Sequence, residues 1–251
     1  MAAIVRQPAA SLVDCELTHL EAQPIDIAQA HAEHAAYVAL LERLGERVTV
    51  LPALEAFPDS CFVEDVLLAL PELFILTRPG ALSRRDEPQH ISSALPDDRP
   101  VAALEAPATL DGGDVLRIGR DVYVGLTTRT NADAVDALGR LVAPFGYQVQ
   151  GIEIDAALHL KTAITALPDG RLLHNPRWVD AARFGDRAAL EAHSDEPFAG
   201  NSLLVGDTVI LHAGHARTAA LLRAQGYAVE TTDISEFAKA EAGLTCLSVV
   251  F

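Results

Sequence analysis

A repeated pattern of short apolar hairpins most constrains the fold of this chain. Four pairs of apolar runs, each pair joined by a short polar turn, begin at Val66, Asp114, Thr162 and Ser202, so their starts lie 48, 48 and 40 residues apart. β-Branched runs with such turns are typical of β-hairpins, and self-similarity at this spacing is typical of repeat architectures. The chain is therefore predicted to repeat one supersecondary unit.

Amphipathic and strand-like segments extend the hairpins into a larger unit. Apolar residues at three- and four-residue spacing predict helices, which lie at 25–45, 130–146, 178–193 and 216–226. Short strands are predicted to close the units at 47–53, 147–154 and 227–234. The unit is therefore two strands, a helix and a strand. The 251 residues hold five such units if the fifth uses both chain ends, with 4–7 pairing near 246–251.

This ββαβ repeat predicts an α/β fold in which five units form a ring. The strand ends would then converge on a central channel, where a functional site could form. The alternative is an ordinary α/β sandwich in which the hairpins recur by coincidence. No linker or low-complexity segment divides the chain, so residues 1–251 are predicted to form a single domain.

The amino-acid composition indicates a globular protein and limits its partners. Half of the residues are hydrophobic and 22% are charged, which is enough apolar material for a sizeable core. Lys and Arg number 19 against 35 Asp and Glu, which gives a formal net charge of −16. Such a surface repels nucleic-acid phosphates and anionic lipids. Neither a nucleic acid nor a membrane is therefore expected as a partner.

The cysteines and the N-terminal residues predict a cytoplasmic protein. Cys15, Cys61 and Cys246 cannot all pair, and they form no CxxC motif. The first residues contain no apolar run of signal-peptide length, and no stretch reaches the roughly eighteen apolar residues of a membrane helix. Reduced thiols are therefore expected.

Two residues are candidates for nucleophilic chemistry. Cys246 lies in GLTCLSVVF before the final strand, where Gly243 is expected to turn the backbone so that the thiol faces a cavity. A thiolate is a strong nucleophile, but a thiol needs a nearby cation to ionise at neutral pH. His159, directly before the third hairpin, is the best candidate for that partner. The alternative is that both residues serve only in buried packing.

The other histidines are weaker candidates. His31 and His34 fall on a helix face that is predicted to be exposed, and His212 and His215 form an HxxH pattern in a glycine-rich turn. A zinc site needs at least a third protein ligand, and the sequence identifies none for this pair. No metal is therefore expected.

Acidic residues gather at the entrances of two hairpins. Asp59, Glu64 and Asp65 lie in FPDSCFVEDV, and Asp111 and Asp114 lie in LDGGDVL. DGGD is also a sequence typical of a tight turn. If both entrances line one channel, however, their carboxylates would repel one another unless they bind a cation. A planar guanidinium fits carboxylates through its paired N–H donors.

Two arginines suggest the other end of the ligand. Arg84 and Arg129 follow two of the hairpins. A solvated surface position is the simplest interpretation of each. In so acidic a protein, two arginines at equivalent loops can also bind a carboxylate through paired hydrogen bonds. The carboxylates would bind a planar cation, and the arginines would bind a carboxylate. A ligand that has both groups is an arginine-like amino acid, which is therefore the predicted ligand.

Six motifs in this order and spacing resemble those of the dimethylarginine dimethylaminohydrolase family, within the guanidino-group-modifying superfamily. They are FPDSCFVEDV, TRPGALSRR, LDGGDVL, RTN, LHLKT and GLTCLSVVF, and the similarity runs from SLVDCELTHL to the C-terminus. The resemblance implies a five-bladed α/β propeller around a central substrate channel. It also implies hydrolysis of Nω-methylated arginine to citrulline and a methylamine through a covalent cysteine intermediate, without a cofactor.

The resemblance also assigns roles to individual residues. Cys246 matches the family nucleophile, His159 the general acid and base, and Asp111 the acidic residue that orients the histidine. The other matches are substrate contacts: Asp65 with Glu64 near the guanidinium, Asp59, Arg84 and Arg129 at the amino-acid end, Leu17 on a flexible lid, and Ala240 through its backbone carbonyl.

Other functions remain open from the sequence. Arginine deimination or amidino transfer would use the same residue types, but deiminases of the superfamily usually carry an inserted helical domain, for which 251 residues leave no room. A non-catalytic arginine-binding protein is a further alternative, although binding alone needs no nucleophile. The expected partner is a small methylated arginine, and a homodimer is left open.

Overall fold

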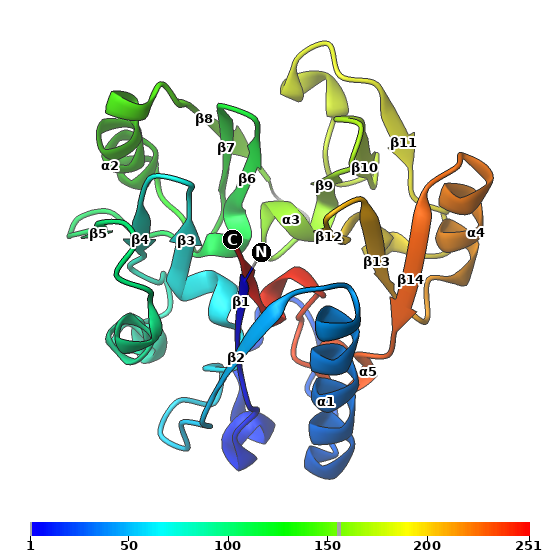
Figure 1. The fold of residues 1–251 in the computed structure, drawn as a ribbon, viewed down its shortest axis with the longest axis horizontal. Helices are drawn as coiled ribbons and strands as arrows, with labels where there is room; N and C mark the ends of the chain where they lie inside the picture. Colours follow the sequence, from blue (N-terminus) through cyan, green and yellow to red (C-terminus); the bar gives the residue numbers. More distant parts are fainter. Residues whose placement is uncertain (1, 155–156) are drawn as a thin grey trace.

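Five three-stranded sheets form the framework of the protein. The computed structural model describes residues 2–154 and 157–251, and the sheets lie around the middle of the molecule (Figure 1). Four sheets consist of consecutive strands, and the fifth joins β15, β1 and β2. The strands are β1 (Ala2–Arg6), β2 (Arg47–Leu51), β3 (Leu67–Ala69), β4 (Phe74–Leu76), β5 (Val101–Ala103), β6 (Val115–Ile118), β7 (Asp121–Leu126), β8 (Gln148–Glu153), β9 (Ile164–Ala166), β10 (Leu172–His174), β11 (Ala189–Glu191), β12 (Leu203–Val205), β13 (Thr208–His212), β14 (Ala228–Thr232) and β15 (Val249–Val250).

Every sheet has the same internal topology. A first pair of strands runs antiparallel, and the second member of that pair runs parallel to the third strand. Parallel neighbours need a crossover connection, which is a helix between β1 and β2, between β7 and β8, and between β13 and β14. The five-fold repeat of strands predicted from the sequence is confirmed, and the five sheets are consistent with a five-bladed α/β propeller.

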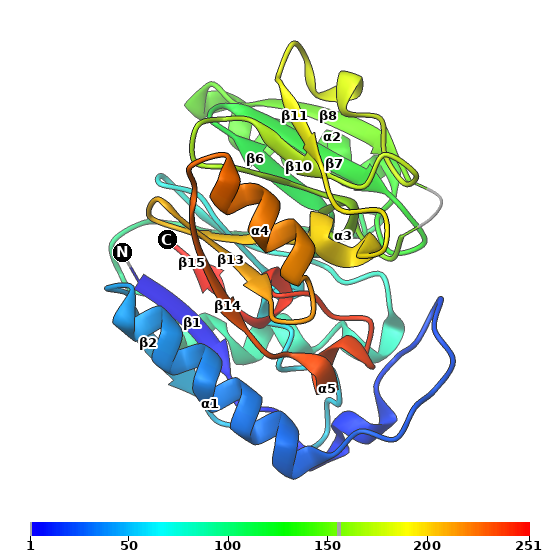
Figure 2. The same cartoon turned by 90° about the vertical axis from the view of Figure 1, so that its right-hand side faces the viewer.

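The two ends of the chain complete the fifth sheet, as the sequence predicted. β1 pairs antiparallel with β15, with Ala3 opposite Val250 and Ile4 opposite Val249. The backbone N–H groups of Ala2 and Phe251 donate to each other's carbonyls at 2.7 and 2.8 Å. Both termini lie near the middle of the ring in the view of Figure 1 and at one side of the molecule in Figure 2. Cys246 lies directly before the last strand.

Three helices cover the outer strands of their sheets. α1 (Ile27–Arg43), α2 (Ala132–Val142) and α4 (Ala216–Ala224) contact β2, β8 and β14, and Figure 2 shows α1 and α4 from the side. Two shorter helices are α3 (Leu160–Ala163) and α5 (Ser235–Ala238). Asp26 and Asn131 cap α1 and α2 by accepting a backbone N–H two residues into each helix. In the described part of the chain, no helix has both the length and the hydrophobicity needed to cross a bilayer.

The predicted helix over 178–193 is wrong. The structure instead has a 3₁₀ turn at Ala181–Phe184 followed by strand β11. Asp180 caps this turn by accepting the N–H of Ala182, and Gly185 then takes a left-handed φ of 79° that ends it. β11 pairs in parallel with β10 and completes the sheet of β9, β10 and β11. This tertiary pairing outweighs the helical spacing of the apolar residues.

His34 corrects a second prediction. His31 is exposed as expected, whereas His34, three residues later, is only 4% exposed and faces the core under α1. Its Nε2 atom has no hydrogen-bond partner. Burial, with a smaller contribution from His31, lowers the pKa of His34 to about 4.

The buried histidine predicts a loss of stability in mild acid. The unfolded chain takes up a proton near the ordinary pKa of 6.5, while the folded chain resists protonation down to about pH 4. The stabilisation is therefore present above pH 6.5 and lost as the pH falls through this window. Between pH 7 and pH 5 this group should cost about 2 kcal/mol of unfolding free energy. Urea titrations at pH 7 and pH 5 measure this loss of unfolding free energy. The loss should be smaller in His34→Gln than in wild type, and in the control His31→Gln it should equal that of wild type.

Candidate active site

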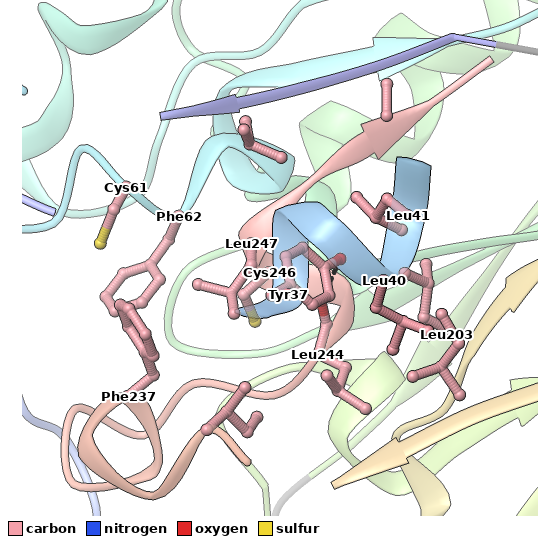
Figure 3. Packing of buried hydrophobic residues seen from close by; sticks show 14 of the residues in the cluster. Tyr37, Leu40, Leu41, Cys61, Phe62, Leu203, Phe237, Leu244, Cys246 and Leu247 are labelled. Atoms are coloured by element: carbon pink, nitrogen blue, oxygen red, sulfur yellow. Dashed lines mark hydrogen bonds between the residues drawn. The ribbon is translucent and has the colours of Figure 1, made fainter. Parts of the chain in front are cut away.

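Cys246 is held in a tight turn directly before the last strand. It lies in the 3₁₀ turn Thr245–Leu247, is 7% exposed, and its Sγ accepts the N–H of Gly243 at 3.4 Å. Figure 3 shows the thiol beside Leu247 and Tyr37. The turn is fixed further by Asn201, whose amide donates to the Thr245 hydroxyl and accepts the Thr245 N–H.

The role expected for Gly243 needs correction. Its φ is not in the left-handed region, so it is not required for a backbone turn. A Cβ at this position would instead lie 2.4 Å from the side-chain amide of Asn201. Glycine is therefore needed because Asn201 packs against the backbone that carries Cys246.

His159 and Asp111 come together from neighbouring units of the repeat. His159 is an extended residue directly before α3, and its Nε2 lies 3.1 Å from Oδ2 of Asp111. The other oxygen of Asp111 accepts the N–H of Gly80 at 2.9 Å. A Cβ on Gly113 would lie 2.6 Å from His159 Nδ1. The DGGD segment does form a turn, and its second glycine also lets the histidine ring approach.

Asp65 lies on the other side of the imidazole. Its Oδ1 lies 3.9 Å from His159 Nδ1 and accepts the N–H of Gly113, while Oδ2 accepts Arg84 Nη1 at 2.7 Å. Burial favours the neutral acid, but His159 and Arg84 outweigh it and hold the pKa of Asp65 at about 2. Asp65 is thus a buried carboxylate that stays ionised.

The carboxylates control the charge of the histidine and the thiol. Burial disfavours a charged His159, but Asp65, the hydrogen bond to Asp111, and Asp114 raise its pKa well above the ordinary range. Burial raises the pKa of Cys246, although its hydrogen bond to His159 lowers it. These shifts favour a protonated imidazole and a neutral thiol in the free site.

Asp114 is a buried acid that the sequence analysis listed at a hairpin entrance without a role of its own. It accepts hydrogen bonds from Thr127, Thr130 and the N–H of Leu160, which begins α3. Burial raises its pKa to about 6, against the effect of His159. Its position in DGGD was the available signal, since Asp111 and Asp114 bracket the same turn.

One cluster in the described ranges has the composition of a metal site. Ligand atoms of Asp65, Asp111 and His159 all lie within 4.8 Å of one another. His159 and Asp111 are at hydrogen-bond distance from each other, and both Asp65 oxygens already accept N–H groups. Because the oxygens and the ring nitrogen are engaged in this way, the cluster is better suited to proton transfer than to coordinating a metal ion.

A small cavity of about 20 Å³ connects most of the residues selected from the sequence. Those that line it are Asp59, Asp65, Arg84, Arg129, His159, Ala240 and Cys246. A cavity of this size holds about one water molecule. Glu16 and Glu241, with Phe62, Leu158 and Ala242, form the rest of its wall, so a larger ligand requires the cavity to widen.

The two arginines differ in how many donors they have available. Arg84 is 4% exposed and is engaged through all three guanidinium nitrogens, with Asp65, Glu87 and two backbone carbonyls as acceptors. Arg129 makes one side-chain hydrogen bond, from Nη2 to the hydroxyl of Thr18 at 3.0 Å. Arg129 is therefore the better placed to bind a ligand carboxylate, while Arg84 holds Asp65.

Glu64 and Leu17 lie apart from this cavity lining. Glu64 accepts Lys161 Nζ at 2.5 Å and the Thr245 hydroxyl at 2.7 Å. With these two partners it lines a larger cavity of about 310 Å³. Leu17 is half-buried in the segment that follows Cys15. Contact of either residue with a substrate stays a prediction.

The fold and the site together define a class of enzyme. Five repeated units bring a cysteine, a histidine and paired carboxylates together, as the resemblance to guanidino-group-modifying enzymes implies. No family model matches the chain. It is 36% identical over 250 residues to the dimethylarginine dimethylaminohydrolase of Pseudomonas aeruginosa, covering 99% of this chain and 98% of that one. It is also 38% identical to that of Streptomyces coelicolor, covering 98% and 95%. The chain belongs to the dimethylarginine dimethylaminohydrolase family.

Solved structures give the same result. The Pseudomonas aeruginosa enzyme, as a cysteine-to-serine mutant complexed with citrulline, superposes with a TM-score of 0.95 at 35% identity, covering 100% of this chain and 98% of that one. A histidine-to-glycine dimethylarginine dimethylaminohydrolase adduct with S-methyl-L-thiocitrulline superposes with a TM-score of 0.94 at 35% identity, covering 100% and 99%.

Proposed function

We propose that this protein hydrolyses Nω-methylated arginine to citrulline and methylamine or dimethylamine, through a covalent bond between Cys246 and the guanidinium carbon. The observation that carries this proposal is that Cys246, His159 and Asp65 line one small cavity, with Asp111 hydrogen-bonded to His159, in a member of this family. The relatives captured with citrulline and as an adduct support the same chemistry.

The first half of the reaction forms the covalent intermediate. When a cationic guanidinium binds beside Cys246, the thiol loses its proton to solvent, and the resulting thiolate attacks the guanidinium carbon. Asp65, ionised and fixed by Arg84, is placed to hold the planar cation. The imidazolium of His159 then donates its proton to the nitrogen of the departing methylamine, and the C–N bond breaks to leave an S-alkylthiouronium on Cys246.

The second half releases the product. His159, now neutral, takes a proton from water as the water oxygen attacks the same carbon. The C–S bond breaks as Cys246 leaves as a thiolate, and the thiolate then takes up the proton of the new hydroxyl group, which gives citrulline and restores the neutral thiol. Asp111, hydrogen-bonded to the ring at 3.1 Å, orients the histidine and stabilises the charge it regains. No step uses a metal or an organic cofactor.

A side-by-side assay tests the substrate class. Citrulline release should be measured from asymmetric dimethylarginine, monomethylarginine and arginine. Both methylated substrates should give citrulline, with kcat/KM well above that for arginine. Faster turnover of arginine would instead indicate a deiminase, and binding without citrulline would indicate a binding protein.

Arg129 predicts how the amino-acid end is recognised. Arg129→Ala should raise KM for methylarginine by roughly tenfold or more, because a charge-assisted hydrogen bond is lost far from the reacting carbon. The decarboxylated analogue should lose little, since it never makes the contact. The measurement is kcat/KM of both proteins on both compounds. Equal losses on the two compounds would mean that Arg129 does not bind the carboxylate.

Three further inferences accompany the proposed reaction. Residues 1–251 act as one catalytic propeller domain, because the site draws on residues between Glu16 and Cys246. The partner is a small molecule, consistent with the ligands in the related structures, and neither nucleic acid nor membrane is needed. A cytoplasmic location and a homodimer, like the single domain, stay predictions.

A further inference from the structure

The segment between Glu16 and Leu20, here called the lid segment, closes one side of the candidate site. Glu16 lines the cavity that contains Cys246 and His159. That cavity measures about 20 Å³, whereas sites for small ligands are commonly about 300 Å³ or larger. The cavity must therefore widen for a substrate to enter, and the lid segment forms part of its wall.

Two proposed substrate-binding residues form hydrogen bonds with the lid segment. The carboxylate of Asp59 accepts the N–H of Glu16 at 3.2 and 3.3 Å. Arg129 Nη2 donates to the hydroxyl of Thr18 at 3.0 Å. A side-chain bond from Ser83 to Glu16 adds a third contact. A substrate that takes the hydrogen-bonding groups of Asp59 and Arg129 will release the lid segment from both.

Glu241, which is not one of the proposed substrate-binding residues, also forms hydrogen bonds with the lid segment. Its carboxylate accepts three successive backbone N–H groups, from Thr18 at 3.0 Å and from His19 and Leu20 at 2.5 Å each. Hydrogen bonds to an ionised acceptor are stronger than those between neutral groups. Glu241 is also a wall residue of the cavity, so its contacts place the lid segment against the site.

The backbone of Glu241 gives a second, independent observation. Its φ is 60°, and within 2–154 and 157–251 it is the one residue other than glycine with a positive φ. A side chain in this region is strained, while glycine adopts it freely. Such strain is found where the surrounding structure holds a residue for a functional reason. Here that residue carries the carboxylate that binds the lid segment.

We propose that Glu241 is the positioning residue that closes the lid segment over an amino-acid substrate, and that it is the main anchor left when the substrate occupies Asp59 and Arg129. The identity of that substrate rests on the proposed function, while the anchoring of the lid segment does not. Glu241 thereby contributes to substrate affinity without touching the reacting carbon.

Glu241→Gly removes the carboxylate without disturbing the backbone, because glycine readily adopts a left-handed φ. The variant therefore tests the hydrogen bonds of the carboxylate alone. Amide hydrogen exchange should rise roughly tenfold at Thr18, His19 and Leu20, with no fall in the melting temperature. KM for methylarginine should rise roughly tenfold, with a smaller change in kcat. Glu241→Gln, which keeps one oxygen acceptor, should give a smaller rise in exchange and in KM.

Glu230→Gln is the matched control. Glu230 lies on β14 and pairs with the exposed Arg43, away from the lid segment, so exchange at residues 18–20 and KM should stay at wild-type values. Unchanged exchange at residues 18–20 in Glu241→Gly would overturn the proposal. An equal rise in amide hydrogen exchange throughout the chain, together with a lower melting temperature, would also overturn the proposal, because it would show a general structural role for Glu241. If methylarginine is not the substrate, the exchange measurement still tests the anchor, so the two failures are distinguishable.

Discussion

Cys246→Ser should abolish citrulline formation, lowering kcat by at least about 10³-fold. A serine hydroxyl does not ionise beside a guanidinium, whereas the thiol does so with help from the substrate and from His159. The cavity and the Asn201 contacts to Thr245 would be kept, so the loss would be chemical. Steady-state citrulline assays measure it directly.

Trapping the intermediate completes this test. Wild-type protein quenched in acid during turnover should carry an adduct on Cys246 in intact-mass spectra, and the serine variant should carry none. Cys15→Ser is the matched control, because Cys15 is half-buried outside the cavity lining and its pKa is raised to about 11, chiefly by burial. That variant should keep wild-type turnover. Substantial activity in Cys246→Ser would contradict the thiol mechanism.

His159→Gly should have the second large effect, with kcat falling by roughly 10²–10⁴-fold for each of the two proton transfers it serves. The imidazolium is the group that donates to the leaving amine, and its removal also takes away a hydrogen bond that lowers the pKa of Cys246. A substrate with a leaving group that needs no proton, such as S-methyl-L-thiocitrulline, should still form the adduct, although more slowly. Failure of that substrate to label the variant, while it labels wild type, would mean that His159 is needed mainly to form the thiolate or for structure.

Asp111→Asn provides the matched variant for His159. It keeps the imidazole but loses the carboxylate whose hydrogen bond raises the pKa of His159. Activity that depends on a protonated acid is lost as the pH rises through the pKa of that acid. The alkaline limb of kcat/KM should therefore move to lower pH in Asp111→Asn, with a smaller fall in kcat than in His159→Gly. An unmoved alkaline limb would assign that limb to another group.

Local features of the sequence were enough to predict the repeat. Alternating apolar runs with polar turns specify hairpins through interactions within about ten residues, and the regular spacing of Val66, Asp114 and Thr162 revealed the ring. Pairing of the two chain ends followed from the same count. The placement of acidic residues at hairpin entrances was also a local feature, because Asp65 and Asp114 directly precede apolar runs.

The segment 178–193 shows where local reasoning fails. Its apolar spacing suits a helix, but a glycine in the left-handed region and the open edge of β10 favour a turn and a strand. His34 was misplaced for a related reason. The packing of α1 against its neighbours, and not the polarity of the side chain, decided which of its faces was buried.

The sequence by itself determined the five-fold architecture, the family and the residue types of the site. Only the tertiary structure decided which of these groups contact one another. Asp65 forms an ion pair with Arg84, Glu64 forms one with Lys161, and Glu241 accepts hydrogen bonds from the lid segment. These partners are 19, 97 and 222 residues apart. Periodicity fixes which way a side chain points within its own strand or helix. Contacts between units, by contrast, depend on how the ring closes, and that is set by packing across the whole chain.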